Sequence, residues 1–165
     1  MVIVMFFSKT LIAACGLAMA LPLTALADPK PSGAGRADPN VVANAYAGNT
    51  VNWKSCKAGV YYGGAWEATA LCEKEGASLG LGKWSVTQKA SVCLDLVWYW
   101  REGNETKSQP QEKNPDCINH VVDANGQIWH NWDGDNDWWR GVAGNMDKGF
   151  KYKRKVKRLR RKLDV

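Results

Sequence analysis

The chain contains two histidines, His120 and His130, whose chemistry would allow proton transfer or metal binding. Ala124, Asn125 and Gly126 between them predict a three-residue hairpin loop with glycine in the left-handed position. That loop length places the histidines directly opposite each other on neighbouring strands, about 5 Å apart. Such a pair could share a proton, act as a pH switch or bind a metal, but a metal site needs a third ligand that the sequence does not identify. The alternative is that both histidines are structural and form hydrogen bonds only to other groups of the folded chain.

Three aspartates, Asp133, Asp135 and Asp137, have the alternate spacing that begins a calcium-binding loop. Trp138 stands where such a loop has glycine, and Gly144 stands where it has its distal glutamate. Because the motif is incomplete, a solvated hairpin turn is the preferred interpretation.

Nine tryptophans are a large number for a chain of 165 residues. Trp138 and Trp139 are adjacent, so on a strand their side chains point to opposite faces and one is expected to be exposed. Trp129 is a further candidate for exposure, because it falls on the opposite face to Ile128. Exposed indoles stack on sugar rings, so these tryptophans predict a glycan- or ligand-binding patch. If both faces of the strands are covered, the same residues belong to the core.

The C-terminal segment, residues 148–165, is strongly basic, with ten Lys and Arg against one Asp. Its net charge is +9, whereas residues 28–147 carry a net charge of −4. Val156, Leu159 and Leu163 would form a thin apolar stripe if the segment were helical. A disordered tail and a tail folded back on the acidic body are the alternatives. The candidate anion-binding residues are Lys153, Arg154, Lys157, Arg158, Arg160 and Arg161.

The charge of this segment predicts attraction to anionic partners that weakens with salt. An exported chain would meet anionic membrane surfaces, lipopolysaccharide and acidic polysaccharides, and each basic residue near a charged membrane contributes about 1 kcal/mol. A nucleic-acid partner conflicts with the export signal described next. The sequence contains no Gly-rich phosphate loop, no arguable Ser-His-Asp set and no motif that indicates a cofactor.

Residues 1–27 have the pattern of a secretory signal peptide, in which a largely apolar run ends in the small-x-small motif Ala25-Leu26-Ala27. The alternative is a lipoprotein-type cleavage that leaves Cys15 lipidated and the protein anchored to a membrane. No later segment of the sequence is long and apolar enough to span a membrane. We therefore expect an exported protein, in the periplasm or outside the cell.

Four cysteines follow the signal peptide, and an even number in an exported chain favours two disulfides. Three pairings are open. The favoured pairs are Cys56–Cys72 and Cys93–Cys117, because each joins neighbouring segments. Loops of that size stabilise a fold by about 3 kcal/mol each. No Cys-x-x-Cys motif is present, which argues against a redox site or a zinc ribbon.

The composition divides the chain after the signal peptide into a flexible leader at residues 28–37, one domain at residues 38–147 and the basic tail. Asp38 and Pro39 predict the first turn of one short helix, and Gly48 predicts its end.

From residue 50 onward the hydrophobic period is two. This predicts a mainly β fold, a single antiparallel meander that curls into a small barrel or a strongly twisted sheet. Residues 101–116 are expected to be a polar loop. The predicted strands are residues 50–53, 60–62, 66–72, 79–87, 90–100, 117–122, 127–132 and 138–142. The core face of the strand at 90–100 is predicted to hold Val92, Leu94, Leu96, Trp98 and Trp100.

Short aromatic motifs between residues 43 and 142 resemble those of a known family. The motifs are Trp53, Gly82-Lys83-Trp84-Ser85-Val86-Thr87, Val92-Cys93 with Trp98, Cys117, Gly126-Gln127-Ile128-Trp129 and Trp138-Trp139. The pattern is similar to the domain of unknown function 995 family, exported proteins of Gram-negative bacteria. The resemblance implies a bacterial envelope location and the Cys93–Cys117 pairing, and it implies no chemistry. The pair Cys56 and Cys72 and the basic tail depart from the pattern.

Three functions are compatible with these features. The leading hypothesis is a non-enzymatic envelope protein that presents an aromatic patch and is held to an anionic surface by its basic tail. The second is a periplasmic hydrolase or metal-binding protein that uses His120 and His130. The third is a protein-binding, inhibitor-like module, which rests on fold analogy alone.

Overall fold

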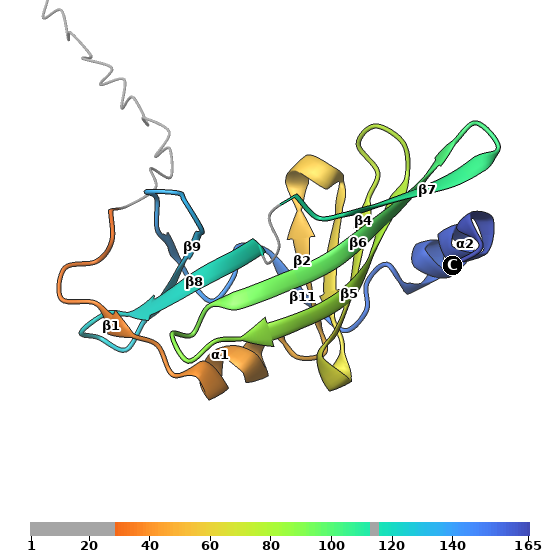
Figure 1. Cartoon of the computed structure of the whole chain (residues 1–165). Helices are drawn as coiled ribbons and strands as arrows, with labels where there is room; N and C mark the ends of the chain where they lie inside the picture. The colour runs from red at the N-terminus through yellow and green to blue at the C-terminus, as the bar shows by residue number, and fades with distance from the viewer. Residues whose placement is uncertain (1–28, 113–115) are drawn as a thin grey trace, which may run out of the picture.

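The structure is a computed structural model that describes residues 29–112 and 116–165 (Figure 1). The expected signal peptide, residues 1–27, and the alternative lipidation site Cys15 lie outside the described residues. The fold is mainly β, as the sequence predicts. Its elements are β1 (Gly35–Arg36), α1 (Pro39–Tyr46), β2 (Asn49–Trp53), the 3₁₀ turn η1 (Lys54–Cys56), β3 (Ala58–Tyr62), the 3₁₀ turn η2 (Gly64–Trp66), β4 (Glu67–Cys72), β5 (Ser78–Val86), β6 (Val92–Glu102), β7 (Glu105–Pro110), β8 (Asp116–Val122), β9 (Ile128–Trp132), β10 (Trp139–Arg140), β11 (Met146–Lys148) and α2 (Lys153–Leu163).

The strands form one antiparallel sheet that curls into a half-barrel. Its order is β10-β9-β8-β6-β5-β4-β3-β2-β11, while β1 pairs with β8 and β7 pairs with β6. Most neighbours in the sheet are also neighbours in the sequence, which is the predicted meander. The long strands β5 and β6 run diagonally through the middle of the molecule (Figure 1).

The prediction of a polar loop at residues 101–116 is wrong, because most of this segment is β-strand. β6 continues to Glu102 and turns back at Gly103, which has a φ of 59°, into β7. Along β6, the first half pairs with β8 and the second half pairs with β7. The polar side chains of β7 gave no alternating hydrophobic signal, because this strand is exposed along most of its length.

The sheet buries side chains on its inner, concave face in one large cluster. Val92, Leu94 and Leu96 of β6 are buried there, as predicted, whereas Trp98 and Trp100 are only half-buried. Gly80 lies beside Trp98, and a Cβ at this glycine would stand 3.3 Å from the indole. The absence of a side chain at this position therefore lets the indole lie close against β5.

Helix α1 closes one end of the half-barrel. Asp38 is its N-cap, and its side chain accepts a hydrogen bond of 2.8 Å from the backbone N–H of Asn40, which satisfies one of the free donors at the helix start. Val42 and Tyr46 are completely buried, and Gly48 follows the helix with a φ of 77°. The predicted start and end of this helix are confirmed.

The leader at residues 28–37 differs in part from the expected flexible segment. Gly35 and Arg36 form β1 and pair with Val122 and Val121 of β8. The next residue, Ala37, is buried in the inner cluster. The end of the leader is therefore part of the fold.

Two disulfides cross-link the half-barrel. Cys56–Cys72 joins η1 to the end of β4, and Cys93–Cys117 joins the paired strands β6 and β8. These are the pairs favoured from the sequence. Disulfides of this kind persist in oxidising, exported environments.

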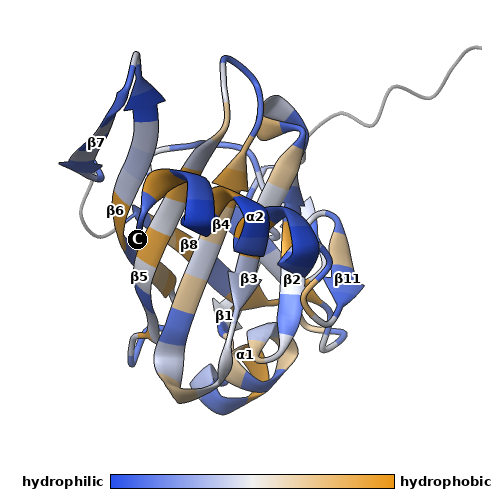
Figure 2. Ribbon diagram, turned by 90° about the vertical axis from the view of Figure 1, so that its right-hand side faces the viewer, coloured by the Kyte–Doolittle hydropathy of each residue, from blue (hydrophilic) through white to orange (hydrophobic). Residues whose placement is uncertain are grey.

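Helix α2 forms from the basic tail and packs on the outer face of the sheet, across β3, β4 and β5 (Figure 2). Val156, Leu159 and Leu163 are buried against Leu71 and Leu79. The three apolar residues are those of the stripe seen in the sequence, and they recur at the spacing that puts them on one side of a helix. The tail is therefore attached to the body through an apolar contact.

Replacing Leu163 with Ala is expected to lower the free energy of unfolding by about 2–4 kcal/mol, because it empties a buried site between α2 and the sheet. Arg158→Ala, on the exposed side of the same helix, is the matched control, with an expected change below about 0.5 kcal/mol. Urea denaturation of the two variants measures the difference. Equal stabilities would contradict the packing of α2 on the sheet.

Candidate functional site

The two histidines lie opposite each other on β8 and β9, in the predicted register. Gly126 in the connecting turn has a φ of 78°, the left-handed conformation expected there. The imidazole centres are 6.5 Å apart. His120 and His130 are 2% and 4% exposed, so the pair belongs to the inner side of the half-barrel.

The ring of His120 is held by its surroundings on both sides. Its Nδ1–H donates to the carbonyl of Ala90 at 2.8 Å, and its Nε2 lies 2.8 Å from the carbonyl of Val142. The hydroxyl of Tyr46 donates to the same Val142 carbonyl at 2.9 Å and lies 3.1 Å from Nε2. Burial lowers the pKa of His120 more than these carbonyls raise it. The ring has no nitrogen left to offer a substrate.

His130 is less enclosed. Its Nδ1–H donates to the carbonyl of Gly141 at 2.9 Å, and burial lowers its pKa. A metal site at His120 and His130 would need a third ligand. Residues 29–112 and 116–165 contain no group of three His, Cys, Asp or Glu that could hold an ion. Each histidine is thus hydrogen-bonded to backbone carbonyls and not to the other histidine, and His130 reaches an open cleft.

That cleft, which we call the indole cleft, has a volume of about 630 Å³ and is lined by three indoles together with His130. Trp53 ends β2, Trp132 ends β9 and Trp139 begins β10. The rings of Trp53 and Trp132 stand edge to face with their centres 6.4 Å apart. β2 and β9 are far apart in the order of the sheet, so it is the curl of the sheet that brings these indoles together.

Polar groups share the wall of the indole cleft with the aromatic rings. Lys54, Ser55, Asp135 and Arg140 supply charged and hydroxyl groups, and all four side chains are exposed. Indoles beside donors and acceptors of both charge signs are the combination that holds a small polar ligand with a flat carbon face. The cleft is therefore the aromatic candidate site of the structure.

The prediction that Trp129 is exposed is wrong, because the residue is only 7% exposed. Its indole N–H donates to Asp123 at 3.0 Å, and the guanidinium of Arg140 covers its ring at 5.2 Å. Trp139 is 39% exposed and lines the indole cleft, whereas Trp138 is half-buried, with the ammonium of Lys30 5.7 Å from its ring. Of the predicted patch, Trp139 alone belongs to the indole cleft.

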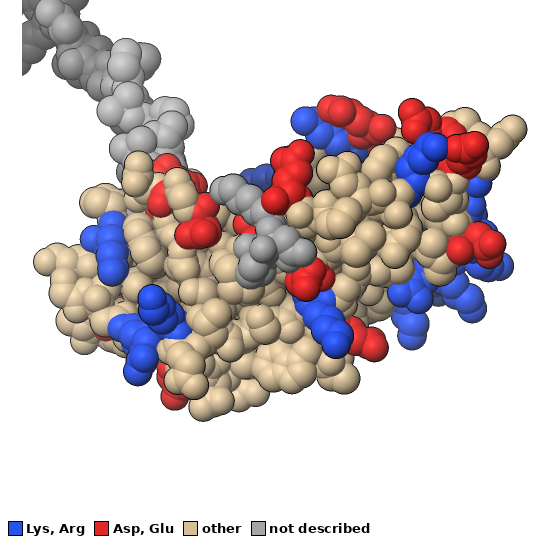
Figure 3. All heavy atoms as spheres, viewed as in Figure 1, with Lys and Arg blue, Asp and Glu red and all other residues tan. Residues whose placement is uncertain are grey.

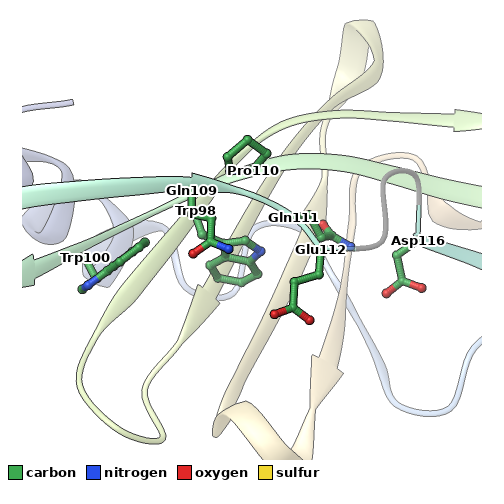
Figure 4. Close-up of a pocket in the computed structure, with 7 residues that line it drawn as sticks. All are labelled: Trp98, Trp100, Gln109, Pro110, Gln111, Glu112 and Asp116. Atoms are coloured by element: carbon green, nitrogen blue, oxygen red, sulfur yellow. The ribbon is translucent and has the colours of Figure 1, made fainter.

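A second hollow, of about 470 Å³, lies between the ends of β6 and β7 and the start of β8 (Figure 4). Trp98 and Trp100 line it together with Glu112 and Asp116. Residues 113–115 connect the two acidic residues and lie outside the described part of the chain. We therefore assign no role to this hollow.

The aspartate-rich turn after β9 is organised by its own hydrogen bonds. The side-chain amide of Asn131 donates to the carbonyls of Asp135 at 2.6 Å and Asp137 at 3.3 Å. Asp133, Asp135 and Asp137 are exposed, and this turn is among the described segments that contain no metal-binding group. The turn has the geometry of a solvated hairpin rather than of a calcium loop.

The predicted anion-binding residues are brought together on α2. All the Lys and Arg of this helix are exposed, because its apolar side faces the sheet. Lys155 forms an ion pair with Glu73 at 2.6 Å. The others have no carboxylate within ion-pair distance in the part of the chain that the structure describes, and Figure 3 shows Lys and Arg gathering at the end of the molecule where α2 lies. They are Lys153, Arg154, Lys157, Arg158, Arg160, Arg161 and Lys162.

Comparison with known proteins places these features in a family. The profile of the family described as Protein of unknown function (DUF995) matches residues 14–161. The match is longer than the resemblance seen at residues 43–142 and includes most of the basic tail. No curated protein and no solved structure matches the chain. Within the described residues, no helix has the length and apolar character needed to cross a membrane.

The histidine pair predicts how stability depends on pH. Burial lowers both folded-state pKa values, while the unfolded chain binds protons near the ordinary histidine pKa of about 6.5. Unfolding therefore takes up protons below that pH. We expect the free energy of unfolding to be constant above about pH 7.5 and to fall as the pH drops through 6.5 toward the folded-state pKa values.

Urea denaturation at several pH values between about 5 and 8 measures this dependence, since ordinary carboxylates titrate below that range. The variant His120→Gln/His130→Gln serves as the matched control, and its stability should change little over the range. A variant that loses as much stability on acidification as the native chain would contradict the assignment.

Proposed function

The chain belongs to the DUF995 family of proteins of unknown function, and we propose that it is an exported, non-enzymatic protein that binds anionic surfaces of the cell envelope through α2. The observation that carries the proposal is the orientation of this helix. Its apolar side is fixed to the sheet by Val156, Leu159 and Leu163, so its basic side is held toward solvent.

The charges of α2 are available to a partner. Among its cations, Lys155 has a partner carboxylate in Glu73, and residues 28–147 carry a net charge of −4 that does not neutralise the helix. A row of fixed, unpaired cations attracts anionic lipid headgroups, lipopolysaccharide phosphates or acidic polysaccharides, and this attraction weakens as salt screens it.

An export route agrees with the proposal. The two disulfides are typical of an oxidising compartment, and a signal peptide at residues 1–27 would deliver the chain there. The envelope of a Gram-negative bacterium, either the periplasm or the outside of the cell, is the proposed location. In both places the phosphate groups of lipids and lipopolysaccharide are the abundant anions.

A second candidate function is supported by the indole cleft. Trp53, Trp132 and Trp139 surround a space of about 630 Å³ that also has polar walls. Sugar rings have an apolar face that stacks on indole and hydroxyls that bind polar side chains. We propose that this cleft binds a glycan, on a part of the molecule separate from α2.

The first test replaces four cations of α2, Lys153, Arg154, Lys157 and Arg158, with Gln. At about 1 kcal/mol per basic residue, affinity for anionic phospholipid vesicles should fall on the order of a thousandfold, and its salt dependence should weaken. Vesicle sedimentation at several NaCl concentrations measures both.

The matched control replaces four exposed cations elsewhere on the protein, Arg36, Lys83, Lys89 and Arg101, with Gln. It removes the same charge and should weaken binding much less. Equal losses in the two variants would mean that net charge, and not α2, drives attachment. Deletion of residues 148–165 is a poorer test, because it would also uncover Leu71 and Leu79.

The second test concerns the indole cleft and uses Trp139→Ala with Trp66→Ala as its control. Trp66 is 50% exposed and lies outside the cleft. The loss of one stacking indole should weaken binding of an N-acetylglucosamine tetrasaccharide about tenfold. Titration followed by NMR measures the affinities, and a tetrasaccharide that binds both variants equally well would exclude the cleft.

A further inference from the structure

A groove of about 460 Å³ lies between α2 and the outer face of β3 and β4, and we call it the α2 groove. Tyr61 and Thr69, which are cross-strand neighbours, lie on the sheet side of it. Phe150, in the segment that leads into α2, lines it as well. The groove is separate from the indole cleft, with which it shares no lining residue.

Four cations of α2 line this groove, Lys153, Lys157, Arg160 and Arg161. Residues spaced by three, four, seven or eight positions lie on one side of an α-helix. The remaining three unpaired cations of α2, which we call the flank cations, do not line the groove. They are Arg154, Arg158 and Lys162. Half of the eight cations of α2 therefore line this groove, whereas Lys162 lines a separate hollow beside Trp98 and Trp100.

Aromatic side chains form the apolar part of the groove. The rings of Tyr61 and Phe150 stack with their centres 4.3 Å apart and an interplanar angle of 5°. Val156 of α2 also lines the groove. Glu67 is the acidic residue of the lining, so the cations exceed the carboxylates by four to one. The groove thus combines an excess of positive charge with a flat carbon surface.

We propose that the α2 groove binds a phosphomonoester group of a lipid headgroup, an inference that rests on the proposed attachment of α2 to an anionic surface. A phosphomonoester carries about two negative charges near neutral pH and three terminal oxygens. Arg160 and Arg161 can each donate two hydrogen bonds to such a group, and the lysines neutralise it as point charges. The carbon atoms next to the phosphate would contact the Phe150 and Tyr61 rings.

This ligand matches the groove better than a carboxylate or a phosphodiester. A carboxylate has a single charge and two oxygens, which leaves most of the donors of Lys153, Lys157, Arg160 and Arg161 unused. A phosphodiester also has one charge, and its second ester bond replaces a terminal oxygen. Four cations around one cavity are best matched by a dianion.

Two triple variants separate the groove from general attraction. Lys157→Gln/Arg160→Gln/Arg161→Gln, the groove variant, removes three groove cations. Arg154→Gln/Arg158→Gln/Lys162→Gln, the flank variant, removes the three flank cations. Each variant loses one Lys and two Arg, and each keeps the apolar side of α2. Both should retain the melting temperature of the native chain, which thermal unfolding monitored by circular dichroism checks.

Binding is measured with phosphatidylcholine vesicles that contain phosphatidic acid, a phosphomonoester, or phosphatidylglycerol, a phosphodiester, at matched surface charge. The native mature chain should prefer phosphatidic acid. On these vesicles the groove variant should bind about tenfold more weakly than the flank variant, since it loses charged hydrogen bonds. On phosphatidylglycerol the two variants should bind equally, and soluble glycerol 3-phosphate should displace the native chain and the flank variant from phosphatidic acid.

Equal losses in the two variants on phosphatidic acid would overturn the groove site and leave the proposed function intact, with α2 acting as a uniform cationic surface. A native chain without preference for phosphatidic acid would overturn it as well. A native chain that binds neither kind of vesicle would overturn both the groove site and the proposed function.

Discussion

The architecture depends on a sheet that buries side chains on both of its faces. Along β5, Leu79 packs beneath α2, while its neighbour Gly80 leaves room for Trp98 on the inner face. Because successive residues of a strand point to opposite sides, one set of strands supports two separate surfaces. The outer surface holds the basic helix in place, and the curled inner surface brings distant indoles together.

The anchoring of α2 explains how a strongly charged segment can have a defined structure. Ion pairs contribute little to the stability of this helix. Within the described residues, Lys155–Glu73 is the one ion pair that joins it to the sheet. The burial of Val156, Leu159 and Leu163 supplies the stabilisation instead. The basic side of the helix is consequently held toward solvent, and within the described residues Lys155 is its one cation with a carboxylate at ion-pair distance.

Local signals in the sequence predicted the local features well. The N-cap Asp38, the left-handed Gly126 and the resulting His120–His130 register each depend on a few adjacent residues. Both disulfide pairs were also predicted, whereas the indole cleft and strand β7 could not be. The indole cleft joins Trp53 to Trp132 through the curl of the sheet, and the polar edge strand β7 has no periodic apolar pattern. Trp129 was misjudged because its partners come from a turn and from another strand.

The central claim is that α2 is a fixed helix on the outer face of the sheet. Nuclear Overhauser contacts between methyl groups, measured in solution on residues 28–165, test it most directly. The account predicts contacts from the methyls of Leu159 and Leu163 to those of Leu71 and Leu79, with helical carbon shifts along residues 153–163. Random-coil shifts over this segment, without contacts to the sheet, would contradict the account.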